Sequence, residues 1–251
     1  MGVAKARFEV VIEREMPKNP VLIVGLPDAG LVGAISSSFL VRALELEEVA
    51  FLDSPGLPPI VVFHNSEPTA PVRIHAKGAT AVLLSEIAIP PGLFRYIAER
   101  VVELAREIEA TRLIMLGGIP VPNRMDVEKP KVYGSGSLDS EREYLRKNGI
   151  ELFKEGFVAG VYASILKESI KRKFPAIILL AESHLNYPDP GAAASAIETL
   201  SKLLGFEVDV GPLLKQEEEI RLKLRELMKR TVDSMKAAGK EYEFSIPLMY
   251  A

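Results

Sequence analysis

Short apolar runs alternate along the chain with longer segments in which apolar residues recur every three or four positions. Strands are predicted at residues 21–24, 81–85, 113–116 and 176–181. Helices are predicted at residues 31–44, 93–108, 138–147 and 157–172. Alternation of this kind indicates parallel βαβ units. The strands are apolar at nearly every position, so we expect a sheet that helices cover on both faces.

Proline interrupts the pattern between residues 52 and 75. This stretch contains Pro55, Pro58, Pro59, Pro68 and Pro71. Proline donates no hydrogen bond to a neighbouring strand and is therefore confined to loops and strand edges. We expect a meander of loops and edge-like strands beside the parallel sheet.

The last quarter of the chain is predicted to be helical. One helix spans residues 192–204 and is closed by Gly205, and a longer one spans 213–238. The longer helix carries an apolar stripe that includes Ile220, Leu224, Leu227, Met228 and Met235. The stripe either lies on the chain's own main domain or joins subunits in a helix bundle.

The pattern divides the chain into three parts. We expect an α/β core domain at residues 1–190, a helical segment at 191–239 that packs on the core and between subunits, and a tail at 240–251. Exposed apolar side chains in such a tail lose solvation free energy unless they are buried somewhere. The tail therefore either folds back on its own domain or serves as a peptide ligand.

Composition narrows the functional classes. The 251 residues carry 31 Lys and Arg against 34 Asp and Glu, a formal charge of -3, and no cysteine. This balance does not favour nucleic-acid or membrane partners, and the lack of cysteine excludes thiolate chemistry. Apolar runs fall far short of the roughly 20 residues of a membrane span. We expect a cytoplasmic protein, and the single glutamine, Gln216, is typical of a thermophilic source.

A glycine-rich turn follows the first predicted strand. Gly25 and Gly30 have the spacing of a phosphate-binding loop, but Leu31 and Val32 stand where lysine and serine or threonine are needed. Asp28 replaces the first glycine of a dinucleotide fingerprint, and its carboxylate repels a pyrophosphate. We expect these glycines to serve tight turning and close packing, with no cofactor.

A second group of polar residues follows the strand predicted at 176–181. Glu182, His184 and Asp189 have the chemistry for proton transfer or for binding a divalent metal. However, Asp189 followed by Pro190 is also typical of a helix N-cap, and we favour that interpretation over a metal site. His64 and His75 flank the proline-rich stretch without metal-like spacing, and chance explains them.

Several motifs resemble the archaeal members of the proteasome assembly chaperone family. They are GLPDAGLVG at 25–33, LGGI at 116–119, GFVAG at 156–160, LAESH at 180–184 and PDPGAA at 188–193. Met249, Tyr250 and Ala251 look like the hydrophobic-tyrosine-any-residue tail with which proteasome activators dock between α-ring subunits.

The resemblance implies a three-layer α/β/α sandwich similar to nucleoside phosphorylases, with a C-terminal helical oligomerisation segment. It also implies a homo-oligomer, a tetramer being favoured, that binds the α-ring pockets of the proteasome core particle. Such a protein is an assembly factor or an ATP-independent activator, not an enzyme. The alternative is a phosphorylase-like enzyme that acts on a small metabolite near residues 25–33 and 182–189.

Overall fold

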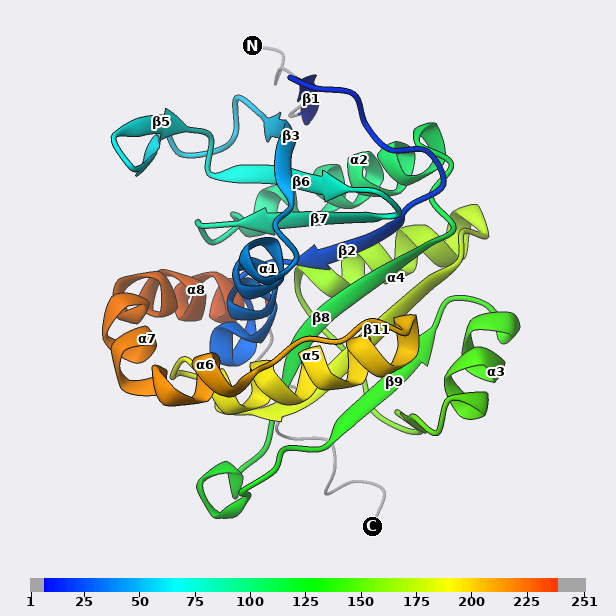
Figure 1. Cartoon of the computed structure of the whole chain (residues 1–251), viewed down its shortest axis with the longest axis vertical. Helices are drawn as coiled ribbons and strands as arrows, with labels where there is room; N and C mark the ends of the chain where they lie inside the picture. The colour runs from blue at the N-terminus through cyan, green and yellow to red at the C-terminus, as the bar shows by residue number, and fades with distance from the viewer. Residues whose placement is uncertain (1–6, 239–251) are drawn as a thin grey trace.

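The computed structural model describes residues 7–238, in which helices enclose a central sheet (Figure 1). The sheet has nine strands in the order β1-β3-β6-β7-β2-β8-β11-β9-β10. These strands are β1 (Glu9–Ile12), β2 (Val21–Gly25), β3 (Glu47–Asp53), β6 (Val72–Lys77), β7 (Thr80–Ser85), β8 (Arg112–Pro120), β9 (Val132–Gly136), β10 (Glu151–Leu152) and β11 (Ala176–Ser183). The predicted three-layer α/β/α sandwich is confirmed.

Helices form the two outer layers. They are α1 (Val32–Ala43), α2 (Phe94–Glu107), α3 (Asp139–Lys147), α4 (Val161–Arg172), α5 (Pro190–Leu204), α6 (Gly211–Lys215), α7 (Glu217–Lys223) and α8 (Arg225–Ala237). The short 3-10 turns are η1 (Ala29–Leu31), η2 (Pro91–Leu93) and η3 (Arg124–Asp126). Helices α2 and α4 cover one face of the sheet, and α1 and α5 cover the other (Figure 1). Within residues 7–238 no helix combines the length and the apolarity that a membrane crossing needs.

Two hydrophobic cores result from the two-residue period of the strands. In β2, Leu22 and Val24 enter the core beneath α2 and α4, whereas Ile23 enters the core beneath α1 and α5. All three side chains are fully buried. Strands at the centre of the sheet are therefore apolar on both faces, which is why the sequence shows continuous apolar runs.

The centre of the sheet is parallel, and antiparallel pairs border it on both sides. Strands β7, β2, β8 and β11 pair in parallel, as the βαβ pattern predicts. On one side β6, β3 and β1 continue the sheet antiparallel, and on the other β9 pairs antiparallel with β11. In the proline-rich stretch, β4 (Val62–His64) and β5 (Glu67–Thr69) form a separate two-stranded sheet. Strand β6, at the end of that stretch, is an interior strand of the main sheet.

The single helix predicted at 213–238 is wrong, because the structure divides this segment into α6, α7 and α8. Gln216 and Leu224 interrupt it, each with a φ near −100° and a positive ψ. A straight helix of this length would extend roughly 39 Å. The two bends instead keep Leu213, Met228 and Met235 in contact with one core cluster. Apolar spacing indicates which residues are buried, but it does not specify where the axis turns.

The helix predicted at 157–172 begins later, at Val161. The preceding Gly160 has a φ of 85° and a ψ of −154°. This conformation is open to glycine and lies outside the helical region. The helix therefore starts only after Gly160.

The domain boundary predicted after residue 190 falls at the start of α5, seven residues after the end of β11. These two elements pack together in the sandwich, and Ile197 and Leu200 of α5 are fully buried in the core. The division into a core, a helical segment and a tail stays a prediction.

Candidate functional site

The glycine-rich turn lies after β2, where strands β7 and β8 flank it. A β-carbon on Gly25 would lie 2.4 Å from the carbonyl oxygen of Gly33. A β-carbon on Gly33 would lie 2.1 Å from the hydroxyl of Tyr162 and 2.4 Å from the carbonyl oxygen of Leu116. Gly30 has a φ of 62°. The expectation that these glycines serve tight turning and close packing is confirmed.

Tyr162 fixes this turn from the start of α4. Its hydroxyl accepts a hydrogen bond from the backbone N–H of Leu26 at 2.7 Å and donates one to the carbonyl oxygen of Leu26 at 3.0 Å. Burial raises the pKa of Tyr162 well above its usual value, so the phenol stays neutral and remains able to donate. Sequence reasoning missed this residue, because nothing in the local pattern around Tyr162 indicates a contact 136 positions away.

Asp189 is a fully buried carboxylate that joins three segments. Its oxygens accept hydrogen bonds from Nε and Nη2 of Arg124 at 2.7 and 2.8 Å. They also accept bonds from the backbone N–H groups of His184, at 3.1 Å, and Ala192, at 2.9 Å. The N–H of Asp189 donates to the carbonyl oxygen of Gly30 at 2.8 Å. The predicted N-cap is confirmed, and the buried ion pair with Arg124 is an addition that the sequence did not reveal.

Glu182 and His184 have different surroundings from Asp189. Glu182 accepts hydrogen bonds from the N–H of Lys131 and the hydroxyl of Tyr133, both at 3.1 Å. The ring of His184 packs edge-on against Tyr187, and its pKa is lowered, chiefly by burial. No hydrogen bond or ion pair joins any two of the side chains of Glu182, His184 and Asp189. Among residues 7–238, no group of three or more metal-ligating side chains has an arrangement that fits an ion.

The two histidines of the proline-rich stretch belong to one cluster of charged side chains, contrary to the expectation that chance places them. Arg73, nearly buried at the centre, contacts Glu48 at 3.2 Å, Glu86 at 2.5 Å and His64 at 3.0 Å. His75 lies 3.7 Å from Glu48. Burial first, and then the charges of Arg73 and His64, lower the pKa of His75 to about 4. The cluster was missed because its members meet only when β3, β4, β6 and the end of β7 are assembled.

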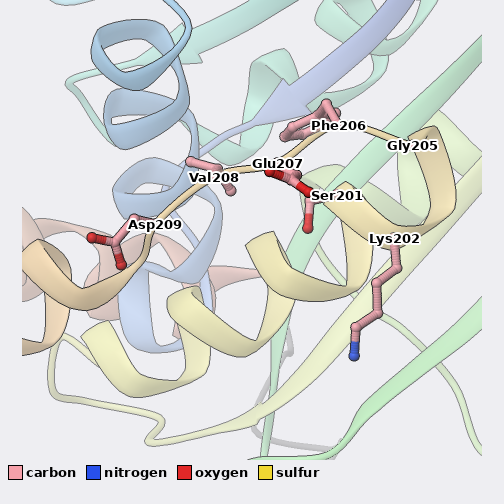
Figure 2. Close-up of a pocket in the computed structure, with 7 residues that line it drawn as sticks. All are labelled: Ser201, Lys202, Gly205, Phe206, Glu207, Val208 and Asp209. Carbon is pink, nitrogen blue, oxygen red and sulfur yellow. The ribbon is translucent and has the colours of Figure 1, made fainter.

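A surface hollow of about 740 Å³ lies where the chain leaves α5 (Figure 2). Its charged members are Lys202, Glu207 and Asp209. The side chain of Lys202 points away from the loop that carries Glu207 and Asp209 (Figure 2). Charged groups that diverge in this way do not form a site for proton transfer.

The residues predicted for oligomerisation lie on α7, on α8 and at Leu224 between these two helices. Met228 and Met235 are buried, 2% and 6% exposed, in the core that α1 and α5 share. Ile220, Leu224 and Leu227 pack against the same core but are only partly buried. The stripe thus lies on the chain's own domain, and its part in oligomerisation stays a prediction. Met249, Tyr250 and Ala251 lie outside the described residues.

Comparison with known proteins identifies one matching family and several solved structures with the same fold. The PAC2 family matches residues 22–228. A protein of Methanocaldococcus jannaschii, described as uncharacterized, is 31% identical over 244 residues that make up 97% of each chain.

Two crystal structures from Pyrococcus furiosus share the fold. PbaA, described as an archaeal homolog of proteasome-assembly chaperone, is 30% identical, with a TM-score of 0.84 over 90% of this chain and 99% of PbaA. PbaB, described as an archaeal proteasome activator, is 23% identical, with a TM-score of 0.75 over 88% of this chain and 99% of PbaB.

We expect Gly33→Ala to destabilise the fold. The new methyl group would overlap the hydroxyl of Tyr162 and the backbone of Leu116, and overpacking of this kind costs about 1–3 kcal/mol or more. The free energy of unfolding, measured in denaturant, checks this. Gly92→Ala is the matched control, because a β-carbon there meets nothing within 4 Å. Equal stability of the two variants would contradict the tight packing.

We expect Asp189→Ala to destabilise the protein by about 3–5 kcal/mol, because it leaves the guanidinium of Arg124 buried without its partner. Thermal and denaturant unfolding measure this loss. Asp139→Ala is the control: Asp139 also pairs with an arginine, Arg142, but its side chain is 99% exposed, and its removal should change stability little. An unchanged free energy of unfolding in Asp189→Ala would show that the ion pair does not hold the segments together.

His75 should make stability depend on pH. Its pKa is about 4 in the folded protein against 6.5 unfolded, so only the unfolded chain takes up this proton between those values. Stability should therefore fall as the pH falls from 6.5 to about 4. Denaturation midpoints of the native chain and of His75→Gln across that range test this. The variant should show the shallower dependence, and identical slopes would rule out this role of His75.

Proposed function

The chain belongs to the PAC2 family, and on that premise we propose that it binds the proteasome core particle as an assembly factor or activator. The observation that carries the proposal is the likeness to PbaA, which extends over 90% of this chain at 30% identity. PbaA is described as a homolog of proteasome-assembly chaperone, and PbaB, which shares the fold, as a proteasome activator. A chaperone or an activator acts by binding another protein, so binding is the activity that we propose.

The proposed contact is the segment Met249, Tyr250 and Ala251. Methionine fills an irregular apolar pocket well, and tyrosine adds a large ring with a hydroxyl that bonds at the pocket wall. In a chain that ends at Ala251, the carboxylate pairs with a lysine or with backbone N–H groups. The receiving pockets lie between subunits of the α-ring.

Binding through such short tails requires several copies. Three residues bury little surface, but tails on a common oligomer make each later contact intramolecular, with a gain of roughly a hundredfold or more. The partly buried side chains of Ile220, Leu224 and Leu227 are the proposed intersubunit contacts. If the occupied pockets favour an open ring, docking shifts the ring toward opening.

The proposal needs no nucleotide. The glycine-rich turn carries Leu31 and Val32 at the positions of the phosphate-binding residues, and Leu31 is fully buried. Tyr162 and the backbone of Leu116 leave no space for an added atom at Gly33. This packing supports an activity driven by binding energy alone.

We expect Tyr250→Ala, and a chain that stops after Leu248, to lose binding to purified archaeal core particle by about tenfold or more, since each tail loses its anchor. Co-sedimentation and stimulated peptide hydrolysis measure the loss. Tyr242→Ala is the matched control, a tyrosine in the same tail but outside the docking segment.

Two other outcomes distinguish a failure of the proposed tail contact from a failure of the proposed binding to the proteasome. Undiminished binding by Tyr250→Ala and the shortened chain would place the contact elsewhere on the protein. No binding by the native chain in any oligomeric state would reject the proteasome as its partner.

A further inference from the structure

A second surface, distinct from the tail and the glycine-rich turn, lies along α7 and α8. A groove of about 1250 Å³ separates these helices from the loop that follows β11 and from η3. We call it the α8 groove and define it by Met125 of η3, Tyr187 of the loop, Leu222 of α7, and Arg225, Lys229 and Lys236 of α8.

Large apolar side chains converge on the α8 groove. Nine such side chains are exposed on the surface of residues 7–238, and three of them line this groove. Met125 is 89% exposed, Tyr187 is 68% exposed and Leu222 is 66% exposed. They come from three elements that only the fold brings together. A cluster of this kind marks an interaction surface better than scattered apolar residues do.

The α8 groove also carries positive charge without a matching partner. Arg221 and Lys223 pair with Glu217 and Glu219 one turn earlier. In contrast, no ion pair joins Arg225, Lys229 or Lys236 to another residue in the range 7–238. Spacings of four and seven place these three on one side of α8.

Acidic groups offset only part of this charge. Glu226 and Asp233 also line the groove. Glu226 is bonded to Arg230 at 3.3 Å. Counting the groups outside ion pairs, the groove has three cations against the single carboxylate of Asp233. It therefore attracts an anionic ligand that also has apolar parts to cover Met125, Tyr187 and Leu222.

We propose that the α8 groove binds an extended acidic peptide segment of a partner protein, with carboxylates and apolar side chains in alternation. Arg225 and Lys229 are four residues apart, a rise of about 6 Å along a helix. Alternate side chains of a strand repeat at roughly 6.6 Å. A peptide with acidic residues at every second position therefore matches the spacing of Arg225 and Lys229, while the residues between them face the apolar side chains.

Peptide chemistry fits this surface better than a polynucleotide. The carboxylate of Asp233 interrupts the row of cations, which suits carboxylates spaced apart along a peptide better than a continuous line of phosphates. The side chains of Met125 and Leu222 offer apolar contact but no hydrogen bond to a base edge. A peptide with alternating acidic and apolar residues can contact both the cations and the apolar side chains of the groove. This interaction is separate from the proposed contact with the proteasome.

The test measures binding of a fluorescein-labelled octapeptide, in which glutamate alternates with leucine and phenylalanine, by fluorescence anisotropy. We expect saturable binding that weakens with salt. Peptides with lysine in place of glutamate, or serine in place of the apolar residues, should bind at least about tenfold more weakly. Residues 241–244 of the chain themselves alternate acidic and aromatic side chains. Both the full chain and a chain ending at Ala238 are therefore assayed.

Variants locate the site. Lys229→Glu combined with Lys236→Glu should weaken binding at least about tenfold, and Leu222→Ser should weaken it without changing the salt dependence. Lys167→Glu is the matched control, an exposed lysine in the middle of α4 on the opposite face of the sheet. Circular dichroism confirms that each variant is folded.

Four results would overturn the proposal. The first is no binding by either chain, and the second is equal binding of the lysine peptide. The third is an equal loss in Lys167→Glu. The fourth is tighter binding of a single-stranded oligonucleotide or of anionic lipid vesicles, which would assign the groove to a different ligand. The assay contains no core particle, so a negative result would not bear on proteasome binding, which the Tyr250→Ala experiment tests separately.

Discussion

The buried ion pair between Asp189 and Arg124 is the constraint on which the carboxyl edge of the sheet depends. A carboxylate without exposed surface is tolerated only if donors surround it, and Asp189 has the two nitrogens of Arg124 and two backbone N–H groups. Through these bonds, and through its own N–H to Gly30, it holds η3, the loop after β11, the start of α5 and the glycine-rich turn in one arrangement.

This arrangement explains why a nucleotide-like turn has no nucleotide-like space. In open α/β sheets the crevice at the carboxyl ends of the strands is where ligands bind. Here Tyr162 bonds both polar groups of Leu26 from one side, and the Asp189 network bonds Gly30 from the other. The backbone N–H of Leu26, a donor of the kind that binds a phosphate in other proteins, is used within this fold. Function is therefore more readily placed on the outer surface, where α8 lies.

Local patterns predicted much of the fold, and long-range contacts account for what they missed. The apolar runs identified β2, β7, β8 and β11, and the Asp189-Pro190 pair identified the start of α5. Nothing near Arg124 indicates that its partner lies 65 residues later. The bends at Gln216 and Leu224 keep the apolar residues of α6 to α8 against one core cluster, and the charged cluster around Arg73 follows from the order of the strands. Each of these depends on how elements pack, which spacing along the chain does not encode.

The overall charge also says little about local surfaces, for a related reason. A formal charge of -3 suggests that the protein does not attract anionic ligands. However, electrostatic interactions are screened over roughly 8 Å at physiological salt, so a ligand responds to the charges near it and not to the total. On α7 the basic residues are neutralised by glutamates one turn away, whereas on the groove side of α8 they are not. Two adjacent helices of similar composition therefore present different surfaces. Ion pairing within each helix, more than the number of charges, determines which of them presents unpaired positive charge.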